Sequence, residues 1–456
     1  MNAETILGTS YVPYVMGAVA IGVLYVIYYH LNQITARKGE PSMLFTAIPL
    51  IGHTLDYASR PYEFLKECKD KTNEIFGMLL GGNRTFIVHD PRSSYLIIQH
   101  TKELSVSEFF DMVLWNFFNT PTTLTHSPHY NEDVLRKMYT PLLLSDKSLN
   151  VFCVRMMKKF KHLYDFKVAP LLKEGASGKP VKLYELVGQF MFNVAIGSLF
   201  DSSVNDTPEK CDKLYAAFND FDKALALSLG GIHLKYQRKA YRGLQYLTEQ
   251  VSGVFTNNSD LMKKRNDYWD SVAEKDSNFM NKQATLNLPL LWASSANSVP
   301  ATFWLIYYLL QQPEHMDRVM REIREHVPNH RQFLAENFNG EVDFENMITM
   351  DQLNKLNFLD ACFNETLRLC SGSFLMRVVK TEGLTVKFAS GNTYSFRKGD
   401  RVGLSTGLYH TNENLFPNPN QFDPFRWYSE DASPEERMAA AYGKIPMKYQ
   451  GEDINS

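Results

Sequence analysis

The sequence is 456 residues long, 44% hydrophobic and 13% aromatic, with a formal net charge of -2. This length allows two domains or one large enzyme fold with a sizeable core. Because the charges are mixed and nearly balanced, no strongly basic surface is expected, and we predict no nucleic-acid partner. The five cysteines show neither a paired disulfide framework nor the spacing of a zinc site, which favours a reducing, cytosol-facing compartment.

The first predicted element is an uncharged helix over residues 11–29. A helix of that length spans roughly 28 Å, close to the thickness of the hydrocarbon layer of a bilayer. Tyrosines gather at both of its ends and basic residues follow it. A cleavable signal peptide would need a basic start, whereas this start carries Glu4. We therefore predict an uncleaved membrane anchor over 1–35 and a cytosolic body over 36–456.

The body is predicted to be mainly α with a small β part. Apolar runs at 76–80 and 85–88 flank a Gly-Gly-Asn turn, which is typical of a hairpin. Helical periodicity dominates from about residue 130 to 370, with helices expected over 150–170, 181–200, 211–229, 241–269 and 288–310. Short strands are expected over 375–379, 384–388 and 393–396. We expect these late strands and the hairpin to form one small sheet.

The predicted helix over 288–310 is apolar almost all round, as a helix through the centre of a protein is. Pro300 cannot donate a hydrogen bond to the carbonyl of Ala296, so the helix is expected to open or kink between these residues. Asn297 and Ser298 offer polar groups at that opening. In the alternative, purely structural interpretation, Asn297 only satisfies the freed backbone.

Glu365 and Arg368 stand three residues apart in an apolar helical pattern, so they share a face of the helix. A buried carboxylate and guanidinium stabilise each other, whereas an exposed pair contributes little. Arg426 follows about 60 residues later, in an aromatic turn fixed by Pro424. Taken alone, the pair of Glu365 and Arg368 is most simply a surface ion pair.

These motifs resemble the cytochrome P-450 family. Glu365-Thr-Leu-Arg368 and Phe422-Asp-Pro-Phe-Arg426-Trp427 are similar to the family's Glu-Arg-Arg triad. The segment 292–304, Trp-Ala-Ser-Ser-Ala-Asn-Ser-Val-Pro-Ala-Thr-Phe-Trp, resembles the distal-haem helix of the sterol 7α-hydroxylase, sterol 12α-hydroxylase and prostacyclin synthase group. The resemblance runs from about residue 40 to 449 and implies the cytochrome P-450 fold.

For a complete homologue, the resemblance implies haem-dependent monooxygenation of a sterol, oxysterol or similar lipid. An NADPH-dependent reductase would donate the electrons, and the endoplasmic reticulum membrane would be the location. Most members carry an acid-threonine pair at the positions of Ala296 and Asn297, and here the acid is missing. Small Ala296 leaves room for a flat, bulky substrate. The implied roles are oxygen and substrate contact for Ala296, Asn297 and Ser298, a haem propionate for Arg377, and support of the proximal side for Glu365, Arg368 and Arg426.

Two further interpretations stay open. Segment 292–304 also resembles the corresponding helix of prostacyclin synthase, an isomerase that needs no reductant. Consumption of NADPH with substrate would exclude an isomerase function. A non-catalytic protein is the other alternative, because the sequence contains no Phe-x-x-Gly-x-x-x-Cys-x-Gly loop and the fold would then be C-terminally incomplete. A truncated splice form, a gene-model artefact or a remnant would each have this sequence.

The present cysteines are not expected to replace the haem ligand. None of them lies in a segment that resembles the haem-cysteine loop, and we predict free thiols buried in apolar surroundings. His126-x-x-His129 lacks a third ligand, so no metal site is predicted there.

The missing loop gives a spectroscopic prediction for a polypeptide of these 456 residues. Without a cysteine thiolate on the iron, the reduced, carbon monoxide-treated protein should show no Soret band at the thiolate position. An absorbance spectrum together with a haem assay checks this. That band at stoichiometric haem would contradict the prediction.

Overall fold

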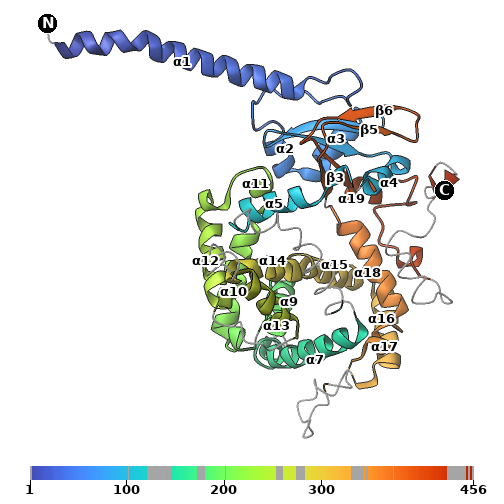
Figure 1. The fold of residues 1–456 in the computed structure, drawn as a ribbon. Helices are drawn as coiled ribbons and strands as arrows, with labels where there is room; N and C mark the ends of the chain where they lie inside the picture. The colour runs from blue at the N-terminus through green and yellow to red at the C-terminus, as the bar shows by residue number, and fades with distance from the viewer. Residues whose placement is uncertain are drawn as a thin grey trace. The chain divides into compact units, whose positions relative to one another are not determined.

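A computed structural model describes residues 3–100, 102–120, 141, 145–171, 180–200, 202–252, 260–273, 283–329, 344, 348–372, 374–428, 448–449 and 452–453. The chain forms two compact units (Figure 1). The first comprises Met1–Phe110, Gly372–Pro417 and Met447–Ser456, and the second comprises Asp111–Ser371 and Asn418–Pro446. The mainly α fold with a small sheet is confirmed.

The first unit combines a long N-terminal helix, a sheet and short helices. Its described elements are α1 (Ala3–Ile34), α2 (Thr54–Ser59), α3 (Pro61–Lys69), β1 (Ile75–Leu80), β2 (Asn83–Val88), α4 (Pro91–Gln99), β3 (Leu104–Ser105), β4 (Phe374–Val379), β5 (Leu384–Lys387), β6 (Thr393–Phe396), β7 (Arg401–Ser405), α19 (Thr406–His410), β8 (Lys448–Tyr449) and β9 (Glu452–Asp453). Helix α5 (Ser107–Asn116) crosses the boundary to the second unit.

The main sheet has the strand order β1-β2-β7-β4-β3. β1 and β2 form the predicted antiparallel hairpin, with Leu80 opposite Asn83, and β7 pairs in parallel with β2. The expectation of a single sheet is right for β4 and wrong for β5 and β6, which pair with each other. Strand β7 was not predicted, because Gly403 weakens its sequence pattern. Glycine is required there, since a Cβ atom would lie 2.6 Å from the carbonyl oxygen of Leu375.

Helix α1 is longer than predicted. Its segment Tyr14–Ile34 is long and apolar enough to cross a membrane, and 6% of it is buried. This apolar exposure distinguishes it from a core helix, whose apolar surface is covered.

The second unit is helical in its described residues. Its elements are α7 (Asp146–Leu163), the π-helix η3 (Tyr164–Val168), α9 (Leu183–Leu199), η4 (Ser202–Asn205), α10 (Pro208–Asp222), α11 (Leu225–Leu229), η5 (Leu234–Tyr236), α12 (Arg238–Ser252), α13 (Asp260–Ala273), α14 (Gln283–Ala296), α15 (Ser298–Gln311), α16 (Pro313–His326), α17 (Met350–Leu353), α18 (Asn357–Cys370) and η8 (Pro424–Arg426).

Helices α14 and α15 run one after the other through this unit (Figure 1). Both contact α9, and α15 also contacts α16 and α18. The largest apolar cluster among the described residues includes α14, with Leu288 and Leu291 fully or almost fully buried. The predicted helix over 211–229 is divided into α10 and α11, and the predicted helix over 241–269 overlaps α12 and α13. Residues 253–259 lie outside the described part of the chain.

A buried histidine of the first unit should make stability depend on pH. Burial lowers the pKa of His89 to about 4, and its Nε2 lies 3.0 Å from Thr72 Oγ1. The unfolded chain therefore binds a proton near pH 6.5, whereas the folded chain does so only near pH 4. Acidification through this range should cost up to about 3 kcal/mol of stability.

Urea unfolding at pH 7, 5.5 and 4 measures this loss of stability on acidification. The loss should be smaller in the variant His89→Gln. His326, on α16, is partly exposed and provides the matched control His326→Gln. An unchanged pH dependence in His89→Gln would contradict the assignment.

Candidate functional site

Glu365 is the centre of a buried hydrogen-bond cluster in the second unit. Its carboxylate is fully buried, and Arg368 binds it with two parallel hydrogen bonds of 2.8 Å. Arg426 Nε donates to the same carboxylate at 3.3 Å. The backbone N–H of Asp423 and the indole N–H of Trp427 add bonds of 3.0 and 2.8 Å. The structure therefore brings the three predicted charged residues together around one carboxylate.

Helix α18 is held in place at its first turn. The carboxylate of Glu322, on α16, accepts the backbone N–H groups of Phe358 at 2.8 Å and Leu359 at 3.0 Å. These are donors that a helix leaves without intrahelical partners, and a negative charge also complements the helix dipole there. Glu322 thus fixes the helix that presents Glu365.

The segment after residue 418 is held by side chains from other helices. Phe422 stacks on Tyr308 of α15, with ring centroids 4.7 Å apart and an interplanar angle of 9°. Arg318 of α16 lies over the rings of Phe358 and Tyr428, at 4.5 and 4.4 Å from their centroids. Such cation-π contacts stabilise a desolvated guanidinium. The segment therefore has a defined shape although it contains little regular secondary structure.

The central helix is interrupted at Asn297, where α14 ends and α15 begins. Ser298 Oγ donates to the carbonyl of Ser294 at 2.6 Å, and the N–H of Ala301 donates to the carbonyl of Asn297 at 3.2 Å. The side chain of Asn297 is exposed and has no hydrogen-bond partner in the part of the chain that the structure describes. Among the described residues it does not bond to the backbone that Pro300 frees. Ala296 is partly buried beside it.

Arg377 lies in the first unit, on β4, opposite Val402 of β7. Its Nε is buried and has no hydrogen-bond partner among the described residues. A buried guanidinium nitrogen without a partner is costly, so a ligand that accepts its hydrogen bond would stabilise it. Its assignment to a haem propionate stays a prediction.

Two interactions of the second unit were not predicted from the sequence. Trp427 was placed in the motif, but its bond to Glu365 was not expected, although a buried indole N–H needs an acceptor. Trp292 Nε1 donates to Asp222 Oδ1 at 2.7 Å, and burial raises the pKa of Asp222. Seventy residues separate this pair, so the local sequence gives no sign of it.

A model of the cytochrome P-450 family matches residues 43–442, and the chain belongs to this family. The chain is 26% identical to cytochrome P-450 7B1 of Mus musculus over 397 residues, covering 86% of this chain and 75% of the relative. It is 26% identical to cholesterol 7-alpha-monooxygenase of Cricetulus griseus over 430 residues, covering 91% and 81%. Prostacyclin synthase of Bos taurus is 24% identical over 414 residues, covering 88% and 78%. The group named from the sequence is confirmed.

The family uses haem held by a cysteine thiolate. The unpartnered Nε of Arg377 fits a carboxylate of this cofactor. The cysteines do not fit its iron, because burial disfavours the thiolate. Burial raises the thiol pKa to about 11 for Cys68 and Cys211 and to about 12 for Cys362, and partial burial also raises the pKa of Cys153. None of these thiols is therefore suited to hold the iron.

All five cysteines are free, as predicted. Cys68, Cys211 and Cys362 are buried, but the prediction of burial is wrong for Cys370, which lies exposed at the end of α18. His126 and His129 lie outside the described residues.

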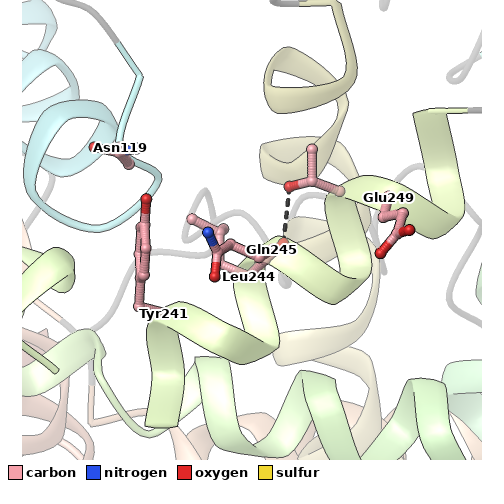
Figure 2. A pocket seen from close by; sticks show the side chains of 6 residues that line it. Asn119, Tyr241, Leu244, Gln245 and Glu249 are labelled. Atoms are coloured by element: carbon pink, nitrogen blue, oxygen red, sulfur yellow. Dashed lines mark hydrogen bonds between the residues drawn. The ribbon is translucent and has the colours of Figure 1, made fainter. Parts of the chain in front are cut away.

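A pocket of about 280 Å³ lies elsewhere in the second unit, along one side of α12 (Figure 2). It is lined by Asn119, Tyr241, Leu244, Gln245, Thr248 and Glu249. The hydroxyl of Thr248 donates to the carbonyl of Leu244 at 2.8 Å. The pocket contains none of the residues predicted for the site.

Replacing the central carboxylate tests the cluster. Glu365→Gln should lower the free energy of unfolding by about 3–5 kcal/mol, because it leaves two guanidinium groups without their charged partner. Asp351→Asn is the matched control, since Asp351 pairs with Lys355 and is 81% exposed. It should change the stability by less than about 1 kcal/mol. Urea unfolding measures both, and equal effects would contradict the buried cluster.

Proposed function

We propose that the protein is a membrane-anchored, haem-dependent hydroxylase of a sterol or oxysterol. The observation that carries the proposal is the likeness to cholesterol 7-alpha-monooxygenase over 91% of this chain. The small residue at Ala296 and the free amide of Asn297 support it, because a flat lipid needs space and a polar contact to orient it. When bound, haem would supply the oxygen chemistry of the family.

Each candidate residue has a role within this proposal. Ala296 would leave space for the substrate, and Asn297 would orient a polar group of the substrate or of oxygen. Ser298 would hold the backbone open through its bond to Ser294. Arg377 would bind a propionate.

The remaining candidates are supporting residues. Glu365, Arg368 and Arg426 would keep the segment after residue 418 in place. They act through that segment and need not touch the substrate.

We place the body on the cytosolic side of the endoplasmic reticulum membrane, with Tyr14–Ile34 as a single anchor. The length and apolar character of this segment support that location, and the basic residues after it favour the cytosolic side. An NADPH-dependent reductase would be the electron donor. A sterol partitions into lipid, so a membrane location would bring enzyme and substrate together.

A second candidate function is the isomerisation of a lipid peroxide. The likeness to prostacyclin synthase favours it, and so does the absence of an acid at Ala296. The two functions differ in their need for a reductant.

Turnover by the protein purified from cells that express its gene tests the proposal. With NADPH, a reductase and vesicles that contain cholesterol or a side-chain-hydroxylated sterol, mass spectrometry should detect a product heavier by one oxygen atom. Product without reductant would support the isomerase instead. No product from haem-loaded protein with either sterol would contradict the sterol proposal.

The role of Asn297 is tested in the same assay. Asn297→Ala should lower kcat/KM by at least about tenfold, or about 1.4 kcal/mol, because it removes an orienting amide. Ser294→Ala is the control, since the Ser294 hydroxyl donates to its own helix at Leu291. Equal activities of the two variants would contradict the role of Asn297.

A further inference from the structure

The C-terminal end of α1 adjoins four buried charged side chains of the first unit, which we call the root cluster. It consists of Glu40, Arg84, Arg397 and Asp400. Glu40 lies in the segment after α1, Arg84 lies on β2, and the other two lie in the turn between β6 and β7. Their side chains are 5%, 3%, 18% and 3% exposed, in that order. Charges so far removed from water persist only when they are paired.

Glu40 joins the two arginines. Arg397 binds its carboxylate with two bonds of 2.6 and 2.8 Å, and Arg84 Nη2 adds a third of 2.9 Å. Asp400 completes the cluster: one carboxylate oxygen lies 3.0 Å from Arg84 Nε, and the other accepts the backbone N–H of Arg397 at 2.8 Å. The cluster therefore connects the segment after α1 to two parts of the main sheet.

The charge of Glu40 persists at neutral pH, whereas burial raises the pKa of Asp400. Burial alone would raise the pKa of Glu40, but hydrogen bonds from Arg397, the backbone of Arg37 and Arg84 outweigh it and lower this pKa to about 2. The carboxylate stays ionised in the folded protein.

Arg397 also holds the end of the helix itself. Its two terminal nitrogens donate to the carbonyls of Asn32 and Thr35, each at 3.1 Å. The last carbonyls of a helix lack intrahelical donors and carry the negative end of its dipole, so a cation is favoured there. One turn earlier, buried His30 hydrogen-bonds through Nε2 to the carbonyl of Thr46 at 2.8 Å.

The short connection after α1 is fixed as well. The carbonyl of Gly39 accepts the N–H of Ser395 on β6 at 2.8 Å. Gly39 has φ +86°, a conformation that favours glycine. Arg37 and Lys38 in this connection are exposed, but the Gly39 carbonyl and the Glu40 carboxylate are both bonded to residues after β5, which a flexible tether would not be.

We propose that α1 is a rigid extension of the sheet, and that the root cluster fixes the angle between α1 and the sheet and thereby the orientation of the first unit relative to the membrane. This inference deepens the proposed function, since it rests on α1 as the membrane anchor. Tilting the helix would break the bonds of Arg397 to Asn32 and Thr35 and would expose the ionised Glu40. One orientation is therefore favoured over the range that a free hinge would allow.

Pulsed electron-electron spin resonance on the full chain in phospholipid nanodiscs tests the proposal. Nitroxide-bearing unnatural residues replace Val23 on α1 and Lys387 on β5, both exposed in the structure. The unmodified chain should give a narrow distance distribution. Glu40→Gln and Arg397→Lys should each widen it by at least about twofold, because a lysine cannot reproduce the paired bonds of an arginine.

Lys398→Gln is the matched control, because Lys398 lies in the same turn and its pair with Glu382 is exposed. It should leave the width unchanged. Amide hydrogen exchange on β1 and β2 verifies that each variant is folded. If Glu40→Gln loses protection against exchange there, the test of the proposal rests on the milder variant Arg397→Lys. A wide distribution in the unmodified chain, or no widening in a folded variant, would overturn the proposal.

A failure of the anchor itself would look different. The label at position 23 would then become accessible to a water-soluble relaxation agent, while the width of the distribution would still report whether α1 is rigid. A missing hydroxylase activity would affect neither measurement.

Discussion

The interaction on which the rest of the second unit depends is the set of hydrogen bonds to the fully buried carboxylate of Glu365. Burying a charge is costly unless hydrogen bonds and an opposite charge replace its hydration. Five donors replace it here, from Arg368, Arg426, Asp423 and Trp427. Arg368 lies on α18 with Glu365, and the other three donor residues follow residue 418, so this one requirement specifies how α18 and that segment meet.

The same logic explains why the surroundings of the cluster are aromatic. Phe422, Tyr308, Phe358 and Tyr428 exclude water from the charges and hold Arg318 by their ring faces. In a low-dielectric environment each hydrogen bond to Glu365 is stronger, and an incomplete cluster is more costly. The triad is thus enclosed by contacts on several sides, whereas Asn297, at the break in the central helix, is exposed in the described part of the chain.

The parts of the fold that could be predicted from the sequence are those specified by neighbouring residues. The Gly81-Gly82-Asn83 turn indicated the hairpin of β1 and β2. Pro300 indicated that the central helix is interrupted a few residues earlier, at Asn297. The triad required more than local pattern, because Arg426 lies 61 residues after Glu365 and only the family resemblance joined them. The pair of Asp222 with Trp292 and the separate sheet of β5 and β6 were missed, since tertiary contacts decide both.

The root cluster has a consequence for how the chain is made. Two residues of the cluster that bind each other, Glu40 and Arg397, are 357 residues apart in the sequence. At typical rates of synthesis, between about 20 and 70 seconds pass between the appearance of the first and the second. During that interval Glu40 is still hydrated and the C-terminal carbonyls of α1 are uncapped. Arg397 can bind them only after the turn between β6 and β7 has left the ribosome, so in its proposed role as an anchor α1 would enter the membrane before its orientation is set.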